Sequence, residues 1–218
     1  MRMRKKKWVS PFLDNENVYT VENLLDFTTD KPIHIEIGMG MGDFICESAM
    51  LNPEIYYIGL ERVDVCVARA VKKASENNLE NFKVMLADAN NIDELIKPKS
   101  IDVIYLHFSD PWPKKRQNKR RLTYQTFLKK YERILKDDGY LVFKTDNEGF
   151  YDDSLVYFSE SNFKLIEESR NYNKPGEPMT AYQAKFVSEG KPIYYAKYSL
   201  KWWCSIIILW SLLKKYLV

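Results

Sequence analysis

Cysteine and histidine are scarce in this chain, which has three cysteines and two histidines among 218 residues. The cysteines, Cys46, Cys66 and Cys204, lie far apart and form no Cys-x-x-Cys pair. This spacing excludes a zinc cluster and a disulfide framework, so we expect no bound metal and a reducing, cytoplasmic compartment. His34 lies in an apolar run, and we expect it to be a core residue rather than a ligand.

Long apolar runs are also missing. A helix needs about 20 apolar residues to span a bilayer, and residues 202–213 (WWCSIIILWSLL) provide only twelve mostly apolar positions. The basic N-terminus is not followed by an apolar segment, so we expect no secretory signal peptide. Three interpretations of residues 202–218 stay open: a membrane-surface helix, a dimer contact or an extension without function. The sequence allows either a monomer or a homodimer.

Basic residues are scarce outside two short runs. Residues 1–7 hold five Lys and Arg and residues 114–121 hold six, which is eleven of the 33 in the chain. Neither run contains an acid, and the remaining chain carries 22 basic against 30 acidic residues. A single basic run is usually a solvated face. Two such runs on an otherwise acidic chain indicate a polyanionic partner, and we expect a nucleic acid.

Segments typical of strands and helices alternate along the chain, which is 45% hydrophobic and 29% charged, as in a globular domain. We expect strands at 33–37, 55–60, 82–87, 101–108, 140–144, 163–169 and 193–200. We expect helices at 21–29, 43–51, 63–77, 92–96, 122–135 and 148–161. This alternation predicts an α/β fold with a mostly parallel seven-stranded sheet and helices on both faces. Residues 193–200 follow no helix of ordinary crossover length, so we expect them to run antiparallel.

The N-terminal residues 1–20 are polar and basic. We expect them to form an arm that Trp8 and Phe12 pin to the body of a single domain spanning residues 1–201. Residues 202–218 would then lie outside this domain.

Three glycines, Gly38, Gly40 and Gly42, follow the first expected strand and precede a helix. Glycine at such a turn allows tight backbone geometry and close packing, so the motif alone is weak. Glu61 ends the next strand nineteen residues after Gly42. A carboxylate there can accept hydrogen bonds from both ribose hydroxyls, so we expect an adenosine-containing cofactor.

Five acids are placed at or near the ends of five successive strands. They are Glu36, Glu61, Asp88, Asp110 and Asp146. For any one of them, capping of the following helix is the simpler interpretation. Five in succession predict a single crevice, because ligands bind at the carboxyl ends of strands in open α/β sheets.

The kind of cofactor follows from Glu36, which lies inside an apolar strand where a charge is costly unless paired. A dinucleotide would bring a pyrophosphate to this loop, and Glu36 would repel it. S-adenosylmethionine would bring a cationic methionine end, which Glu36 would attract. Asp88 would reach the adenine amino group. The motif is also Gly-x-Gly-x-Gly rather than the dinucleotide pattern Gly-x-Gly-x-x-Gly.

Residues 107–121 (HFSDPWPKKRQNKRR) join an acid to the second basic run. Two prolines fix φ and remove two N–H donors, so neither a helix nor a central strand continues through Asp-Pro-Trp-Pro. Trp112 would either stack on a base or anchor the corner by packing. We expect this segment to lie where the cofactor site and a bound nucleic acid meet.

These residues resemble the bacterial tRNA (guanine-N7-)-methyltransferases, a class I family with a Rossmann-like fold. The resemblance runs from about Met1 to Lys201. Its carriers are RMRKKKW (2–8), EIGMGMGDF (36–44), GLE (59–61), Asp88-Ala89, FSDPWPKKR (108–116), FKTDN (143–147) and PMTAYQAKF (178–186). The resemblance implies methyl transfer from S-adenosyl-L-methionine to guanine N7 in the variable loop of tRNA.

The resemblance also implies roles for individual positions. Cofactor contacts fall on Glu36, Gly38, Gly40, Glu61, Asp88 and Asp110. Substrate contacts fall on Lys114, Asp146, Thr180, Ala181, Tyr182 and Gln183. RNA contacts fall on Arg116, Gln117, Asn118, Lys119, Arg120 and Arg121. Asp110 and Asp146 are the expected catalytic pair.

Two positions depart from the family pattern. Gln117 stands where the family usually has histidine, and Gln183 stands where it usually has glutamate. Thr180 and Gln183 still fit a capping box for a helix through residues 184–188. These departures place substrate affinity in question more than reaction type.

Two other functions compete with the methyltransferase. The first is an NAD(P)-dependent oxidoreductase, which Glu36 and the glycine spacing disfavour. The second is a non-catalytic RNA-binding protein on a degenerate methyltransferase fold, which Gln117 and Gln183 favour. Binding of S-adenosylmethionine rather than NAD would distinguish the methyltransferase from the oxidoreductase. Analysis of the tRNA nucleosides for a methylated product would distinguish it from the non-catalytic RNA-binding protein.

Overall fold

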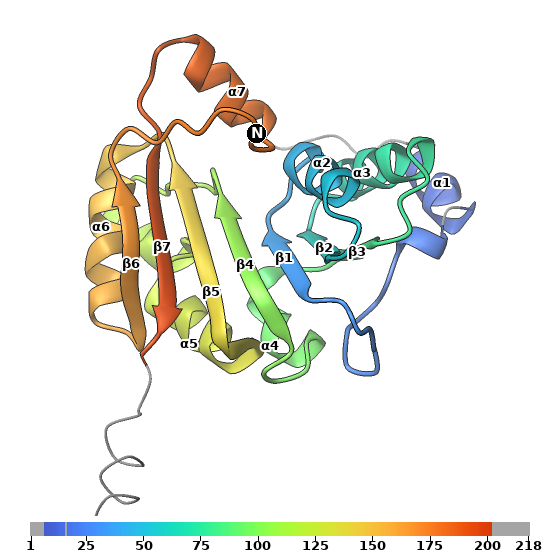
Figure 1. The fold of residues 1–218 in the computed structure, drawn as a ribbon, viewed down its shortest axis with the longest axis horizontal. Coiled ribbons are helices and arrows are strands. Elements are labelled where there is room, and N and C mark those ends of the chain that lie inside the picture. Colours follow the sequence, from blue (N-terminus) through green and yellow to red (C-terminus); the bar gives the residue numbers. More distant parts are fainter. Residues whose placement is uncertain (1–6, 16, 202–218) are drawn as a thin grey trace, which may run out of the picture.

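The computed structural model describes residues 7–15 and 17–201. Residues 202–218 lie outside this part of the chain, so their expected roles stay predictions. The strands are β1 (Ile33–Ile37), β2 (Tyr56–Glu61), β3 (Phe82–Leu86), β4 (Ile101–His107), β5 (Leu135–Thr145), β6 (Phe163–Ser169) and β7 (Tyr194–Leu200). They form one sheet in the order β3-β2-β1-β4-β5-β7-β6 (Figure 1).

The pairing confirms the expected mostly parallel sheet. The strands β3, β2, β1, β4 and β5 pair in parallel, and β7 runs antiparallel to both β5 and β6. β1 and β4 are neighbours although β2 and β3 separate them in sequence. The order in which successive strands are added to the sheet therefore reverses between β1 and β4, and ligands bind at this switch point in doubly wound sheets.

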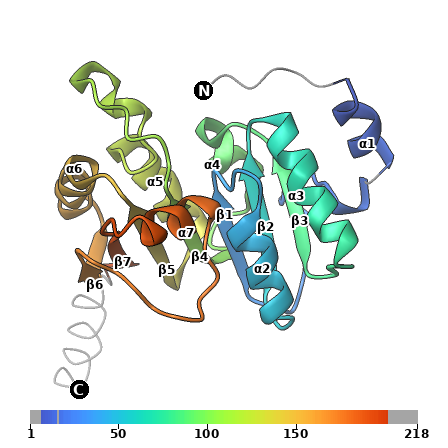
Figure 2. The ribbon, with the colours of Figure 1, turned by 90° about the horizontal axis from the view of Figure 1, so that it is seen from above.

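Helices cover the two faces of the sheet unequally. One face is covered by α4 (Ile92–Leu95), α5 (Gln125–Ile134) and α6 (Glu148–Ser159). The other is covered by α2 (Asp43–Leu51) and α3 (Asp64–Glu76), which pack over β2 and β3. Figures 1 and 2 show that no helix of the described chain lies flat on this second face over β5 and β7. In β2 and β3, residues on opposite faces supply the two cores, as the strand pleat requires: Ile58 and Met85 belong to the first, Tyr57 and Val84 to the second.

The described part of the expected N-terminal arm contains regular structure. A helix, α1 (Val9–Asn15), packs on α3, with Val9 buried against Val65 and Ala68. Phe12 packs against this cluster, while Trp8 is about half exposed. A short 3₁₀ turn, η1 (Asn17–Tyr19), follows. The prediction that Phe12 pins this segment is confirmed.

The expected helix at 21–29 is wrong. The backbone N–H groups of Val21 and Leu24 donate instead to the carbonyls of Val84 and Leu95, at 3.0 and 2.7 Å. The Asn23 side chain also accepts from the N–H of Leu25 at 3.0 Å, a local turn that competes with a helix. The segment is therefore bound across the sheet's edge.

Most other boundaries lie within two residues of expectation, but the starts of β5 and α5 are shifted further. β5 begins at Leu135 rather than at residue 140, because Leu135 pairs with Ile101 before an irregularity shifts the register to Val103 and Tyr140. α5 begins at Gln125 rather than at residue 122. No helix of the described residues is long and apolar enough to cross a membrane.

Candidate functional site at the carboxyl ends of the strands

The five acids lie along the carboxyl edge of the parallel strands, as expected. Glu36 lies near the end of β1, and Glu61 is the last residue of β2. Asp88 follows β3 as the N-cap of η2 (Ala89–Asn91), while Asp110 and Asp146 follow β4 and β5. Because these strands are parallel, their ends meet at one edge beside the switch point.

The glycine turn combines both roles that its sequence allowed. Gly38 and Gly40 have φ of +77° and +56°, a region that other residues rarely adopt. A Cβ on Gly40 would meet no atom within 4 Å, so this backbone faces open space. A Cβ on Gly42 would lie 2.7 Å from the Cβ of Ala70, so Gly42 allows α2 to pack on α3. Gly42 is thus structural and Gly40 leaves room for a ligand, whereas a Cβ on Gly38 would lie 3.7 Å from Cδ1 of Leu122.

Glu36 is buried, and only one of its two carboxylate oxygens has a hydrogen-bond partner among the described residues. Its Oε1 lies 3.2 Å from Nδ1 of His107, and its Oε2 has no hydrogen-bond partner among the described residues. Burial, reinforced by the charge of Asp43, raises the pKa of Glu36 well above the usual value, and Lys144 opposes this shift. A cation at the free oxygen would offset the cost of this buried acid. The ammonium group of S-adenosylmethionine meets that requirement.

Glu61 and Asp88 are already bound by the protein's own backbone. Glu61 accepts from the N–H groups of Gly40, Arg62 and Val63 at 3.1, 2.9 and 3.0 Å. Asp88 accepts from the backbone N–H and the side-chain amide of Asn90, at 2.9 and 2.7 Å. Capping is therefore a role of Asp88, the N-cap of η2, whereas Glu61 is not the N-cap of α3 (Asp64–Glu76). The Glu61 bonds hold the glycine loop and the residues before α3 together, and both sets of bonds fix the carboxylates for a ligand.

Asp110 and Asp146 differ from these two acids. Both side chains are exposed, and neither makes a hydrogen bond or an ion pair with the described part of the chain. Asn147, the next residue, caps α6 (Glu148–Ser159) by accepting from the N–H of Phe150 at 2.8 Å. Capping thus does not explain Asp146. Both carboxylates are available for a ligand.

The basic run forms a 3₁₀ segment, η3 (Lys115–Arg120), directly after the Asp-Pro-Trp-Pro corner. Its exposed residues are Lys114, Lys115, Arg116, Lys119 and Arg120. Gln117 and Asn118 are half-buried, and the Asn118 amide donates to the Tyr157 hydroxyl at 3.0 Å. Arg121, by contrast with these cations, is buried. The guanidinium of Arg120 lies 5.1 Å from the ring centre of the half-buried Trp112, and both expected roles of this ring stay predictions.

The segment of residues 180–183 begins a helix above the strand ends. α7 (Ala181–Ser188) lies above the ends of β4 and β5 in Figure 1. The Thr180 hydroxyl accepts from the N–H of Gln183 at 3.0 Å, which confirms the predicted cap, although the helix begins earlier than expected. Ala181 and Tyr182 are exposed, while Gln183 is buried. Thr180, Ala181 and Tyr182 are thus the accessible members of this segment.

Sequence reasoning missed a buried lysine between the two halves of the site. Lys144, two residues before Asp146, is buried, with its Nζ 3.9 Å from Oε2 of Glu177. The same Nζ lies 4.6 Å from the ring centre of Tyr172, whose hydroxyl donates to Glu177 at 2.5 Å. Lys144 therefore holds the loop that leads into Thr180. The signal that identified Glu36, a charged residue inside an apolar strand, would also have identified Lys144.

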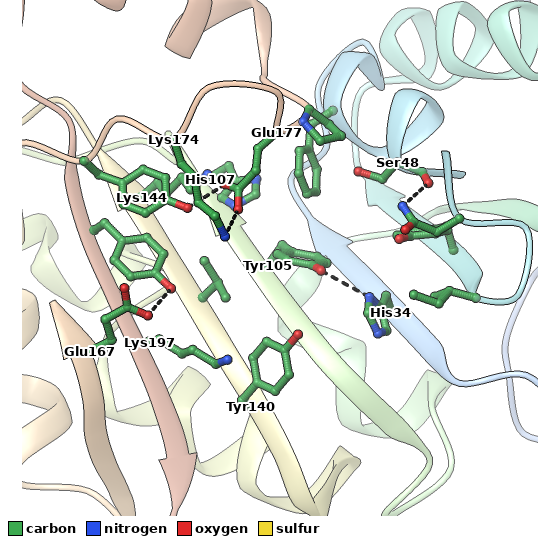
Figure 3. Close-up of a pocket in the computed structure, with 18 residues that line it drawn as sticks. His34, Ser48, Tyr105, His107, Tyr140, Lys144, Glu167, Lys174, Glu177 and Lys197 are labelled. Atoms are coloured by element: carbon green, nitrogen blue, oxygen red, sulfur yellow. Dashed lines mark hydrogen bonds and ion pairs between the residues drawn. The ribbon is translucent and has the colours of Figure 1, made fainter. Parts of the chain in front are cut away.

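A sizeable cavity lies on the open face of the sheet (Figure 3), and Lys144 and His107, the partner of Glu36, are among the residues that line it. It has a volume of about 510 Å³ and none of the expected cofactor residues lines it. Its polar groups largely satisfy one another: His34 Nδ1 lies 3.1 Å from the Tyr105 hydroxyl, and Lys197 lies 3.8 Å from the ring centre of Tyr140. Burial lowers the pKa of His34 to about 4, so this core histidine is neutral, as expected.

The described residues contain no cluster of potential metal ligands. No group of three or more His, Cys, Asp and Glu side chains there is arranged to hold an ion. The cysteines Cys46 and Cys66 are buried thiols.

Comparisons with solved structures give the fold. A SAM dependent methyltransferase from Aquifex aeolicus superposes with a TM-score of 0.58, covering 80% of this chain and 86% of that one at 13% identity. A 30S ribosomal A1408 methyltransferase from an uncultured bacterium superposes with a TM-score of 0.58, covering 91% and 97% at 19% identity. The protein therefore has the Rossmann-like fold of S-adenosylmethionine-dependent methyltransferases.

Comparisons with known sequences are more specific. A family model described as "Putative methyltransferase" matches residues 30–196. The tRNA (guanine-N(7)-)-methyltransferase of Bacillus subtilis (strain 168) is 42% identical, over 90% of this chain and 98% of the relative. The enzyme of the same name from Listeria monocytogenes serotype 4b is 42% identical over 89% and 96%. The chain belongs to the tRNA (guanine-N7-)-methyltransferase family.

Proposed function

We propose that this chain transfers a methyl group from S-adenosyl-L-methionine to N7 of a guanine in the variable loop of tRNA, forming 7-methylguanosine. The observation that carries this proposal is the pair of unpartnered carboxylates, Asp110 and Asp146, between a buried half-satisfied acid and an exposed basic segment, all within the described residues. The acid matches a cationic cofactor, and the basic segment matches an RNA backbone.

The cofactor side would be formed by the first three strand ends. Glu36 would take the ammonium group, Glu61 the ribose hydroxyls and Asp88 the adenine amine, with Gly40 leaving room for close approach to the turn that Gly38 begins. Glu61 and Asp88 are held by backbone amides, so both are positioned before the cofactor arrives. S-adenosyl-L-methionine, when bound, supplies an electrophilic methyl group on a sulfonium centre.

The chain's part in the chemistry is positioning. Guanine N7 has a lone pair and no proton, so no general base is needed, and the task is alignment of the two reactants. Asp146 would accept hydrogen bonds from the guanine N1–H and amino group, while Asp110 would orient the methionine end beside it. Both carboxylates are exposed and unpartnered within the described chain, as these roles require.

Substrate recognition would involve two further segments. Lys114 would contact guanine O6 or a phosphate, and Thr180 to Gln183 would close over the base from α7. The buried side chain of Gln183 makes a structural role for that residue compatible with the family departure. Arg116, Lys119 and Arg120 would hold phosphates, which predicts a strong dependence on salt.

The decisive experiment is mass spectrometry of nucleosides from tRNA incubated with the protein and S-adenosyl-L-methionine. We expect 7-methylguanosine, and its absence would contradict the proposal. Protein that binds tRNA and cofactor without forming product would support the degenerate, non-catalytic alternative. Titration calorimetry with S-adenosyl-L-methionine and with NAD would test the oxidoreductase alternative.

We also propose that residues 1–201 act as a single domain in the cytoplasm, where tRNA is available and buried thiols such as Cys46 stay reduced. Light scattering on the full chain would decide between a monomer and a homodimer. A membrane-flotation assay with and without residues 202–218 would test the surface-helix reading of that segment.

A further inference from the structure

Arg121 is the one member of the expected RNA-contact set that is buried among the described residues. Its exposed fraction is 4%, whereas the neighbouring Lys119 and Arg120 are exposed. It lies between the end of η3 and the start of α5. A guanidinium in this position is shielded from a phosphate, so another role is needed to explain it.

The contacts of Arg121 define that role, because all three of its side-chain nitrogens are used. Nε donates to the carbonyl of Pro111 at 2.7 Å, and Nη2 donates to the carbonyl of Trp112 at 3.4 Å. Nη1 donates to Oδ2 of Asp153 at 2.6 Å and to the Tyr157 hydroxyl at 3.2 Å. The guanidinium also lies 5.2 Å from the ring centre of Phe150. Arg121 therefore ties the Asp-Pro-Trp-Pro corner to α6.

The backbone of that corner needs such a tie. Trp112 has a φ of +43° and Phe108 a φ of +50°, and neither is a glycine. Trp112 also precedes a proline, which restricts its backbone further. Strained residues of this kind persist only where the surrounding structure holds them, and they gather at functional sites. Asp110 lies between these two residues, so its position depends on the same backbone.

We propose that Arg121 is a positioning residue that fixes Asp110 against the cofactor crevice, and that it does not contact RNA. The planar fork of its guanidinium holds two successive carbonyls directly after Asp110, while Asp153 neutralises its charge. This inference rests on the proposed function through the role of Asp110. Arg121, the last residue of the basic run, would then serve the methyl-transfer site and not the RNA-binding surface.

The test compares Arg121→Gln and Arg121→Lys with Arg120→Gln as the matched neighbour. Three quantities are measured: the dissociation constant of S-adenosyl-L-methionine by calorimetry, kcat at saturating tRNA, and the slope of log Kd for tRNA against log salt. For Arg121→Gln we expect kcat to fall at least about tenfold and cofactor affinity to fall several-fold, with an unchanged salt slope. For Arg120→Gln we expect a shallower salt slope, by about one, and unchanged cofactor affinity.

Arg121→Lys separates charge from geometry. A lysine keeps the positive charge but cannot form the fork that binds two carbonyls, so we expect it to fail as Arg121→Gln does. Restored kcat in Arg121→Lys, or a shallower salt slope in Arg121→Gln, would overturn the proposal in favour of an RNA contact. Unchanged kcat and cofactor affinity in both variants would overturn it as well.

A milder variant guards against loss of the fold. Asp153→Asn removes the charge on the half-exposed partner and leaves Arg121 in place. We expect a two- to threefold fall in kcat with the same melting temperature to within a few degrees, and an unchanged kcat would count against the proposal. The cofactor titration needs no RNA, so it still reports on Arg121 if wild-type protein forms no 7-methylguanosine, the result that would contradict the proposed function itself.

Discussion

The two sides of the proposed site hold their carboxylates in different ways. Glu61 and Asp88, at the ends of β2 and β3, are bound by backbone amides, whereas Asp110 and Asp146, beyond the ends of β4 and β5, make no bond within the described chain. The first pair is therefore part of the fold and is in place before a ligand binds. The second pair makes no contact that would stabilise the described fold, so a ligand is the better explanation of its charge. Mutations on the two sides should consequently separate stability from activity.

The largest effect is expected for Asp146→Ala. The variant removes the carboxylate that would accept two hydrogen bonds from guanine, each contributing about 1.5–3 kcal/mol when one partner is charged. We expect formation of 7-methylguanosine to fall at least about 100-fold, with an unchanged melting temperature and unchanged cofactor binding by calorimetry. Asp152→Ala, which removes an exposed acid paired with Arg170, is the control and should be active. Unchanged turnover in Asp146→Ala would contradict the assigned role.

The next effect is expected for Glu36→Gln, where stability and binding should change in opposite directions. Because the pKa of Glu36 is raised in the folded protein, folding favours its protonated form. This contribution to stability is complete below the unfolded pKa and is lost as the pH rises through the folded pKa. The amide cannot ionise, so we expect Glu36→Gln to unfold at a higher temperature than wild type at pH 8 and at a similar temperature at pH 4.

Cofactor binding should show the opposite sign in the same variant. The amide loses the charge-assisted bond to the ammonium group, and we expect an affinity about tenfold lower. In wild type, binding of that cation should drive a proton from Glu36. Calorimetry in buffers of different ionisation enthalpy should therefore show proton release, and Glu36→Gln should abolish it. Equal proton release in both proteins would show that Glu36 is not the group that titrates.

A smaller effect is expected for Lys144→Met. Lys144 contacts Glu177 and Tyr172, on the loop that leads to Thr180. Its removal should therefore make this loop, and the proposed substrate contacts that follow it, less well fixed. We expect KM for tRNA to rise several-fold with little change in cofactor affinity. Lys174→Met is the matched control, since Lys174 binds the same Glu177 at 2.7 Å from an exposed position. An equal effect of the two variants would mean that Glu177 alone, and not the buried lysine, holds the loop.

The smallest effect is expected for Lys115→Gln, which changes one exposed cation on η3. Removing one Lys–phosphate ion pair should reduce the slope of log affinity against log salt by about one. We expect tRNA affinity to fall two- to fivefold at low salt and to match wild type at high salt. Filter binding over a range of salt concentrations measures this. A deficit that persists at high salt would indicate an interaction other than an ion pair.

Much of the fold was predictable because each buried parallel strand is a short apolar run that ends in an acid or a glycine. The runs at 33–37 and 82–87 carry that signal, and the structure places both as expected within a residue. The helix predicted at 21–29 failed because its backbone groups bond to residues 60 or more positions away. The early start of β5 has the same cause, since Leu135 pairs across the sheet with Ile101. Long-range pairing leaves no local pattern.

The site shows the same division. The strand-end acids and the glycine turn follow from local spacing, and they were found from the sequence. Arg121 was not distinguished from its neighbours, because six cations in eight positions look alike until α6 supplies Asp153 and Tyr157. Lys144 was missed although, like Glu36, it is a charge inside an apolar strand. Its partners, Tyr172 and Glu177, come from a loop that the sequence does not place.

The antiparallel direction of β7 has a practical consequence for handling the protein. β5 enters the sheet at the edge opposite the crevice, and β7 leaves it there: Ser199 pairs with Tyr140, and Leu200 pairs with Phe163 at the start of β6. Lys201 thus lies at the opposite end of the strands from Asp110 and Asp146. An affinity tag, a fluorophore or a surface linkage attached there would leave the methyl-transfer edge facing solution, so immobilised protein should still accept a molecule as large as tRNA.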